Sequence, residues 1–188
     1  MEPNGLTESH ENLKPSPWVV RFAPLVPWQR RVLDVACGSG RHARYFLDRE
    51  HPVVAIDRDV SAIADLADRA GVEIMQADLE DGAWPLDGRR FAAIVVTNYL
   101  HRPLFPRLLA ALEPHGVLIY ETFALGNERF GRPRNPNFLL APGELLRITA
   151  ATLRIVAYEH REVSRPKRAV MQRICAVNDR IAEAGGLP

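Results

Sequence analysis

Cysteines and long apolar runs are both scarce in this sequence. The only cysteines are Cys37 and Cys175, and they fit neither a disulfide framework nor the spacing of a zinc site. No apolar run in the first thirty residues is long enough for a secretory signal or a membrane span. We therefore expect a cytoplasmic protein with no metal and no membrane partner.

An excess of charge of either sign is also missing, since the formal net charge is only +1. Such a balance gives little general attraction for phosphate backbones, so nonspecific nucleic-acid binding would need a local basic patch. The basic group at residues 161–168 has no interleaved aromatic residues on which bases could stack. Nucleic acid is not expected as a partner, and composition alone names no function.

The length of 188 residues suits one domain with a core of its own. Residues 1–14 are polar and show no apolar periodicity, which is typical of a flexible N-terminal arm. The sequence therefore predicts a single domain over residues 15–188, preceded by this arm.

Strand-like and helix-like patterns alternate along most of the chain. Strands are predicted over residues 31–36, 53–56, 72–76, 91–97 and 117–123. Helices are predicted over residues 41–50, 60–70, 104–112 and 142–148. This alternation implies an α/β fold in which right-handed crossovers build a parallel sheet with helices on both faces. Two last strands, over residues 153–159 and 169–177, are close enough in sequence to form a hairpin.

The turn after the first strand has the sequence DVACGSGR, residues 34–41. Two glycines allow a sharp bend and bring bare main chain close to a ligand, and the following helix offers free amide donors. Such a turn suits the carboxylate of a methionyl group, while Asp34 could accept from its ammonium, directly or through water. The same residues also fit the dinucleotide fingerprint G-x-G-x-x-G/A, with Asp57 placed for a ribose contact.

Two acidic features favour a methyl donor over a dinucleotide: Asp34 within the strand before the turn, and the segment ADLE at residues 77–80. The motifs VLDVACGSG (32–40), VVAIDRD (53–59) and QADLED (76–81) resemble the successive cofactor loops of the class I S-adenosylmethionine-dependent methyltransferases. In size and few appendages, the chain is similar to the tellurite-resistance-type members of that family.

This resemblance extends over roughly residues 30 to 178 and implies a Rossmann-like sheet of seven strands. The sheet would be mostly parallel, with an antiparallel last strand inserted beside the fifth. That arrangement would account for the terminal hairpin, which Rossmann dehydrogenases lack.

The resemblance also implies roles in binding S-adenosylmethionine, whose product is S-adenosylhomocysteine. The methionyl part would contact Asp34, Gly38 and Gly40, the ribose hydroxyls would contact Asp57, and the adenine would border Asp78 and Leu79. Four further residues are assigned to the cofactor site: Ala36, Cys37, Arg58 and Asn98. Ala36 departs from the family pattern, which usually has a glycine at this position.

Few catalytic groups are expected, because methyl transfer from a sulfonium is an in-line displacement that depends mainly on positioning. His101, after the fourth strand, is the candidate general base, since imidazole titrates near neutrality. Tyr99 is the second candidate, either lining the acceptor pocket or facing the sulfonium with its ring. A structural hydrogen bond for His101 and core packing for Tyr99 are the alternatives.

The loop over residues 121–142 is rich in glycine, proline and asparagine and is too long for a simple connection, which favours a binding loop. Its arginines alternate with an aromatic residue and a proline, so they could close over an anionic or planar acceptor. The predicted acceptor site comprises Trp18, Arg102, Glu121, Arg129, Phe130 and Arg132. As alternatives, the arginines are solvated, Glu121 pairs with one of them, and Trp18 packs on the sheet.

The function predicted is S-adenosylmethionine-dependent methyl transfer to a small-molecule acceptor. An RNA- or protein-directed methyltransferase is an alternative, although no broad basic face is visible in the sequence. An NAD-dependent oxidoreductase and a non-catalytic cofactor-binding protein are alternatives from other classes.

Overall fold

The central strands are apolar at nearly every position because helices cover both faces of the sheet. A computed structural model describes residues 14–82 and 84–179. In it, β1 (Val32–Val35) is buried at every residue, and β4 (Phe91–Thr97) at all but its last. Continuous burial of this kind is typical of parallel strands in α/β proteins.

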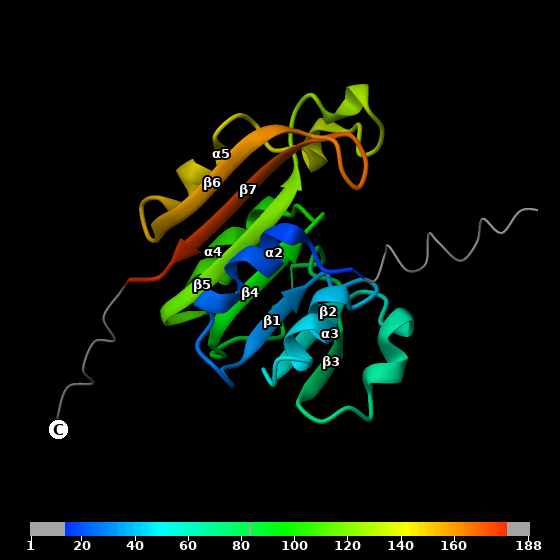
Figure 1. Cartoon of the computed structure of the whole chain (residues 1–188), viewed down its shortest axis with the longest axis vertical. Coiled ribbons are helices and arrows are strands. Elements are labelled where there is room, and N and C mark those ends of the chain that lie inside the picture. Colours follow the sequence, from blue (N-terminus) through cyan, green and yellow to red (C-terminus); the bar gives the residue numbers. More distant parts are fainter. Residues whose placement is uncertain (1–13, 83, 180–188) are drawn as a thin grey trace, which may run out of the picture.

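Seven strands form one sheet in the order β3-β2-β1-β4-β5-β7-β6 (Figure 1). The remaining strands are β2 (Val53–Asp57), β3 (Val72–Gln76), β5 (Leu112–Phe123), β6 (Arg154–Val163) and β7 (Ala169–Val177). β1 to β5 are parallel, whereas β7 is antiparallel to both β5 and β6. The predicted Rossmann-like fold is confirmed, including the terminal hairpin beside the fifth strand.

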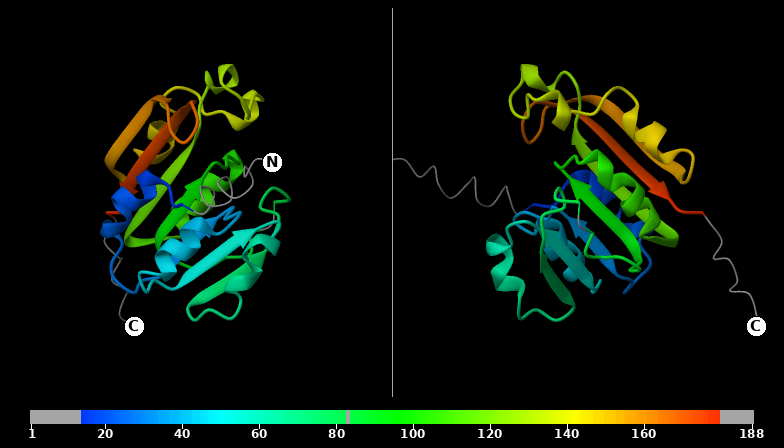
Figure 2. Two further views of the ribbon diagram at one scale, coloured as in Figure 1. Left: turned by 45° about the vertical axis from the view of Figure 1, so that its right-hand side comes forward. Right: turned by 180° about the vertical axis from the view of Figure 1, so that it is seen from behind.

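Helices cover the two faces of the sheet (Figures 1 and 2). α2 (Pro17–Phe22) and α3 (Arg41–Leu47) pack against one apolar cluster, and α4 (Phe105–Ala110) and α5 (Glu144–Thr149) against the other. Short 3₁₀ helices complete the chain: η1 (Ala23–Leu25), η2 (Ser61–Leu66), η3 (Arg102–Leu104), η4 (Asn127–Arg129) and η5 (Pro136–Phe138). No helix among these described residues is long and apolar enough to cross a membrane.

The segment after β2 differs from the prediction, which was an α-helix over residues 60–70. The structure has the 3₁₀ helix η2 there. Ile63 and Leu66 are both buried, whereas Ala67, the third residue of the predicted apolar face, is exposed. A spacing of three residues aligns side chains in a 3₁₀ helix, so this geometry buries both apolar residues.

β5 also differs from the prediction, because it already begins at Leu112 and contains the turn expected at residues 114–116. Its pairing with β4 shifts between Phe91 and Ala93, so that Leu112 and Val117 face nearly adjacent positions of β4. The extra residues form a bulge, in which His115 has a left-handed φ of 62°.

The strand order reverses at β1, which pairs with β2 on one side and β4 on the other. The loops that follow β1 and β4 therefore lead in opposite directions along the sheet. In open α/β sheets, ligands bind in the crevice between two such loops. Of the predicted flexible arm, residues 1–13 lie outside the described residues.

Candidate functional site

The loop between β1 and α3 is bent by three left-handed residues, with φ values of 51° at Ala36, 53° at Gly38 and 68° at Gly40. At Gly40 a Cβ atom would lie 2.5 Å from Cγ2 of Ile63, so glycine is required there by both conformation and space. A Cβ at Gly38 would meet nothing within 4 Å. The loop is therefore packed against η2 on one side and open at Gly38.

Asp34 lies beneath this loop and is only 1% exposed. Its Oδ2 accepts a hydrogen bond from the Ala43 amide at 2.9 Å, which connects β1 to the first turn of α3. Burial raises the pKa of the carboxyl to about 7, against the lowering effects of that hydrogen bond and of Arg41. Asp34 thus supports the loop from below. Its contact with a ligand ammonium, directly or through water, stays a prediction.

His42 is the buried neighbour of Asp34, with its Nδ1 4.0 Å from the carboxylate Oδ1. Its Nε2 accepts a hydrogen bond from the Ser16 amide at 3.1 Å. Burial, together with the charge of Arg41, lowers the pKa of His42 to about 3. The imidazole is therefore neutral at physiological pH and links the segment before α2 to the glycine loop.

Asp57, at the end of β2, joins the loops that follow the first two strands. Its Oδ2 accepts from the Gly38 amide at 2.8 Å, and its Oδ1 accepts from the Asp59 amide at 3.1 Å. Its main-chain carbonyl accepts from the Ala77 amide at 2.9 Å, which attaches the loop after β3. Three consecutive loops are thus held together at the carboxyl edge of the sheet.

A cavity of about 350 Å³ opens at this edge, within the usual range for small-molecule sites. Six of the residues that line it were predicted for the site, and three were not. The nine are Ala36, Asp57, Arg58, Ala77, Asp78, Leu79, Glu80, Tyr99 and Phe138. Cys37, Gly38, Gly40 and Asn98, also predicted for the cofactor, lie in the adjoining loops at the same edge.

The cavity carries more negative than positive charge, since three carboxylates line it beside the single guanidinium of Arg58. Burial raises the pKa of the Tyr99 phenol well above its ordinary value, and the charges of Glu80, Asp78 and Asp57 raise it further. Tyr99 is therefore a neutral hydrogen-bond donor or an aromatic wall, and it cannot act as a base at neutral pH.

The backbone that carries Tyr99 is fixed from inside the core. The buried Tyr120 donates its hydroxyl to the Tyr99 carbonyl at 2.8 Å, and its ring stacks on Phe105. His101 lies two residues further on, half-buried at the start of η3, and does not line the 350 Å³ cavity. Its role as a base stays a prediction.

Arg102, predicted to contact the acceptor, is bound to neighbouring parts of the chain in this structure. Its guanidinium forms a two-pronged ion pair with Glu144, at 2.7 and 3.0 Å. It also donates to the carbonyls of Asn137 and Leu139. These four bonds assign it to the structure of the 121–142 loop.

The predicted aromatic-arginine cluster in this loop is formed, but away from the cavity. The guanidinium of Arg129 lies 5.1 Å from the Phe130 ring centre, and Arg168 of the β6–β7 hairpin lies 4.5 Å from it. Arg129 also donates to the Gly126 carbonyl. Neither Arg129, Phe130 nor Arg132 lines the cavity. The cavity is instead lined by Phe138 of this loop, which was not predicted from the sequence. The only signal in the sequence was an aromatic side chain in a loop otherwise rich in polar residues.

Glu121 and Trp18, both predicted to bind the acceptor, are buried on the α2 face of the sheet. Glu121 pairs with Arg173 of β7 at 3.0 Å, not with an arginine of its own loop. The Trp18 indole donates to the Ile174 carbonyl at 3.2 Å and contacts Phe22 edge-on. Trp18 therefore has the packing role that was the alternative, and its contact with an acceptor stays a prediction.

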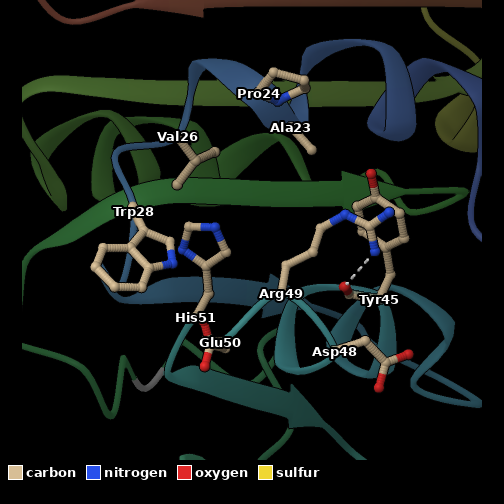
Figure 3. A pocket seen from close by; sticks show the side chains of 9 residues that line it. All are labelled: Ala23, Pro24, Val26, Trp28, Tyr45, Asp48, Arg49, Glu50 and His51. Atoms are coloured by element: carbon tan, nitrogen blue, oxygen red, sulfur yellow. Dashed lines mark hydrogen bonds between the residues drawn. The ribbon is translucent and has the colours of Figure 1, made fainter.

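A second cavity, of about 360 Å³, lies at the opposite edge of the sheet (Figure 3). It is formed by residues 23–28, which precede β1, and by the segment that precedes β2. Two of its charged groups contact neighbours: Arg49 lies 3.7 Å from the centre of the Tyr45 ring, and Asp48 pairs with Arg69. None of the predicted site residues lines it.

Comparison with known families gives one match, to a methyltransferase domain, over residues 32–116. This range contains the loops after β1, β2, β3 and β4 that line the carboxyl-edge cavity, but not the loop of Phe138. No curated protein matches the chain.

Solved structures of methyltransferases share the fold. TehB from Haemophilus influenzae superposes with a TM-score of 0.70 and 18% identity, over 85% of this chain and 61% of TehB. A putative S-adenosylmethionine-dependent methyltransferase from Listeria monocytogenes gives 0.67 and 16%, over 87% of this chain and 98% of that one. The 1,6-didemethyltoxoflavin-N1-methyltransferase from Burkholderia thailandensis, solved with its acceptor and S-adenosylhomocysteine, gives 0.66 and 23%, over 87% and 77%.

The domain match includes the glycine loop, Asp57 at the end of β2 and the acidic loop after β3. Residues 32–116 therefore match a methyltransferase domain, and the chain has the fold of solved S-adenosylmethionine-dependent methyltransferases.

Proposed function

We propose that the chain transfers the methyl group of S-adenosylmethionine to a small-molecule acceptor by in-line displacement, with residues 15–188 acting as one catalytic domain. The observation that carries this proposal is the cavity at the carboxyl edge, where Asp57, Asp78 and Tyr99 converge from three different loops. Parallel α/β sheets place their ligands at this edge.

The charge of the cavity supports this cofactor over a dinucleotide. A dinucleotide pyrophosphate brings two negative charges, which three carboxylates beside one guanidinium would repel. S-adenosylmethionine has a net positive charge because of its sulfonium, so the same carboxylates attract it. The Gly38 amide, which a pyrophosphate would need, already donates to Asp57.

When bound, S-adenosylmethionine supplies an electrophilic methyl group on its sulfonium. The residues of this chain then have to bind and orient. Asp57 accepts from the ribose hydroxyls, and Asp78 with Leu79 borders the adenine. Tyr99, protonated at neutral pH, presents its ring or hydroxyl to the reacting end.

His101 is the candidate for removing a proton from an oxygen, nitrogen or thiol acceptor. It follows β4 on the same loop as Tyr99, two residues from a cavity-lining side chain. The role requires that the acceptor bind between this loop and the cofactor.

A small-molecule acceptor fits the near-neutral charge of the chain and the low charge excess of its basic hairpin. Arg161 pairs with Glu159, and Arg168 pairs with Glu162 and lies over Phe130. These pairs reduce the positive field that an RNA-directed enzyme would need. Both cysteines are free and buried, which fits action in the reducing cytoplasm.

Thermal-shift measurements test the cofactor. A ligand at about a hundred times its dissociation constant stabilises a protein by roughly 2.7 kcal/mol. We expect such stabilisation with S-adenosylmethionine and S-adenosylhomocysteine and none with NAD; stabilisation by NAD alone would refute the proposal. Transfer of labelled methyl groups to pools of small molecules, with RNA and protein pools assayed in parallel, then identifies the acceptor class.

A further inference from the structure

One large apolar side chain in the 121–142 loop is held in an exposed position beside the cofactor cavity. Phe138 is 46% exposed, whereas the next two residues, Leu139 and Leu140, are almost completely buried. Phe138 is also the only residue of this loop that lines the 350 Å³ cavity. An exposed phenylalanine next to buried residues gains further apolar contact only when something covers its ring.

The backbone on both sides of Phe138 is fixed by one side chain. Arg102 Nη1 donates to the Asn137 carbonyl at 2.7 Å, and Nη2 donates to the Leu139 carbonyl at 2.9 Å. The Asn137 amide, in turn, donates to the side chain of Asn135 at 3.0 Å. The φ and ψ angles that direct the Phe138 ring are therefore set by contacts outside the ring itself.

Glu144 completes this arrangement at the start of α5. Its carboxylate accepts from Nε and Nη2 of Arg102, and Oε2 also accepts from the Ala141 amide at 2.7 Å. Although burial alone would raise the pKa of Glu144, these hydrogen bonds and the charge of Arg102 hold it below its usual range. Arg102 is thus charged, oriented and anchored to a helix, and four hydrogen bonds occupy most of its five N–H groups.

We propose that Phe138 covers the bound cofactor with its ring and so sets the affinity of the site, and that Arg102 is the positioning residue that holds Phe138 there. This inference rests on the proposed function, because the cavity must receive the adenosyl group for the ring to contact it. Phe138 contributes a flat apolar ring. Such a ring can stack on the face of a base whichever way the polar edge of the base points. Arg102 has no contact with the ligand of its own.

Calorimetric titration of the full chain with S-adenosylhomocysteine tests both residues. Phe138→Ala should bind about tenfold more weakly, as the loss of one base–aromatic contact implies, while Phe138→Tyr, which keeps the ring, should stay within about twofold of the wild type. Arg102→Ala should lose about as much affinity as Phe138→Ala. The matched control is Arg89→Ala. It removes another two-pronged ion pair, between Arg89 and Glu73, whose hydrogen bonds measure 2.7 and 2.6 Å. This variant should bind S-adenosylhomocysteine with wild-type affinity.

The double variant Arg102→Ala/Phe138→Ala distinguishes positioning from direct binding. If Arg102 acts through Phe138, the double variant binds no more weakly than Phe138→Ala. Losses that multiply would overturn the positioning role, and wild-type affinity of Phe138→Ala would overturn the whole inference. If Arg102→Ala does not fold, as its melting curve would reveal, the comparison of Phe138→Ala with Phe138→Tyr still decides the role of the ring. Failure of the wild-type chain to bind S-adenosylhomocysteine would instead refute the proposed function.

Discussion

The two edges of the sheet contain cavities of nearly equal volume, about 350 Å³ at the carboxyl ends of the strands and about 360 Å³ at the amino ends. Their chemistry differs. At the carboxyl edge, three carboxylates and a phenol converge from loops bent by left-handed residues. At the amino edge, Arg49 lies on Tyr45 and donates to its carbonyl (Figure 3). His51 donates to the Arg30 carbonyl.

Volume therefore does not distinguish the two cavities, whereas the direction of the strands does. Parallel strands bring the loops that follow them to one edge, and the polar groups of these loops accumulate there. At the other edge, Arg49, Asp48 and His51 contact other groups of the chain. Four predictions would break or sharpen this contrast.

Gly40→Ala should have the largest effect. The added Cβ would lie 2.5 Å from Ile63 Cγ2, and the residue would keep a left-handed φ of 68°. Together, crowding and the backbone conformation should lower the free energy of unfolding by about 3 kcal/mol, and cofactor binding should be lost. Urea unfolding measures the change. Gly38→Ala is the matched control, since its Cβ meets no atom, and it should lose only about 1 kcal/mol.

Asp57→Asn should weaken binding of S-adenosylhomocysteine by about tenfold to a hundredfold, because hydrogen bonds to a charged group contribute roughly 1.5–3 kcal/mol. Calorimetry measures the affinity, and a melting curve checks that the Gly38 and Asp59 amides still hold the loops. The control is Asp48→Asn at the amino-edge cavity, which should bind normally. Equal losses in both variants would contradict the assignment of the carboxyl-edge cavity.

The buried pair Asp34 and His42 should give opposite pH dependences. With a pKa raised to about 7, folded Asp34 keeps a proton that the unfolded chain releases, so its contribution to stability falls as pH rises toward 7. With a pKa lowered to about 3, folded His42 lacks a proton that the unfolded chain holds up to about pH 6.5, so its contribution rises over that range.

Between about pH 4 and 6.5 the two contributions oppose each other, each by up to about 1.4 kcal/mol per pH unit. Asp34→Asn should therefore show a free energy of unfolding that increases with pH over this range relative to the wild type, and His42→Gln one that decreases. Urea unfolding at several pH values measures both slopes. Parallel curves for the two variants would show that neither group titrates as its burial implies.

Ala36→Gly should have the smallest effect, a gain of about 0.5 kcal/mol. Ala36 has a left-handed φ of 51°, which costs an alanine roughly 1–2 kcal/mol, and the greater freedom of unfolded glycine offsets part of the relief. Urea unfolding measures the gain. Destabilisation would mean that the methyl group of Ala36 packs usefully against the cavity wall.

The fold could be predicted well because its signals are local. The apolar runs of β3 and β4 predicted both strands to the residue, and the glycine turn marked the end of β1. Where the prediction was wrong, two kinds of secondary structure would bury the same apolar residues. In η2, apolar residues three apart satisfy a 3₁₀ helix as well as one face of an α-helix.

Six residues of the carboxyl-edge cavity could be named from the sequence, since they lie at or just after strand ends that could be located. The acceptor side was less accessible from sequence. Arg102 and Glu121 were recognised as charged residues near the correct edge, but their partners, Glu144 and Arg173, come from distant elements. Phe138 was missed because its environment depends on bonds between residues 37 apart.

By itself, the sequence determined the alternation of strands and helices, the bend after β1 and the position of Asp57 and Asp78 at the ends of their strands. These follow from periodicity, glycine conformation and chain direction, which act over a few residues. Only the tertiary structure decided that Asp34 is buried beneath the loop, that Arg102 holds the 121–142 loop and that Phe138 borders the cavity. Burial and pairing of this kind depend on side chains brought together by folding, and no local pattern encodes which of several charged or aromatic residues will meet.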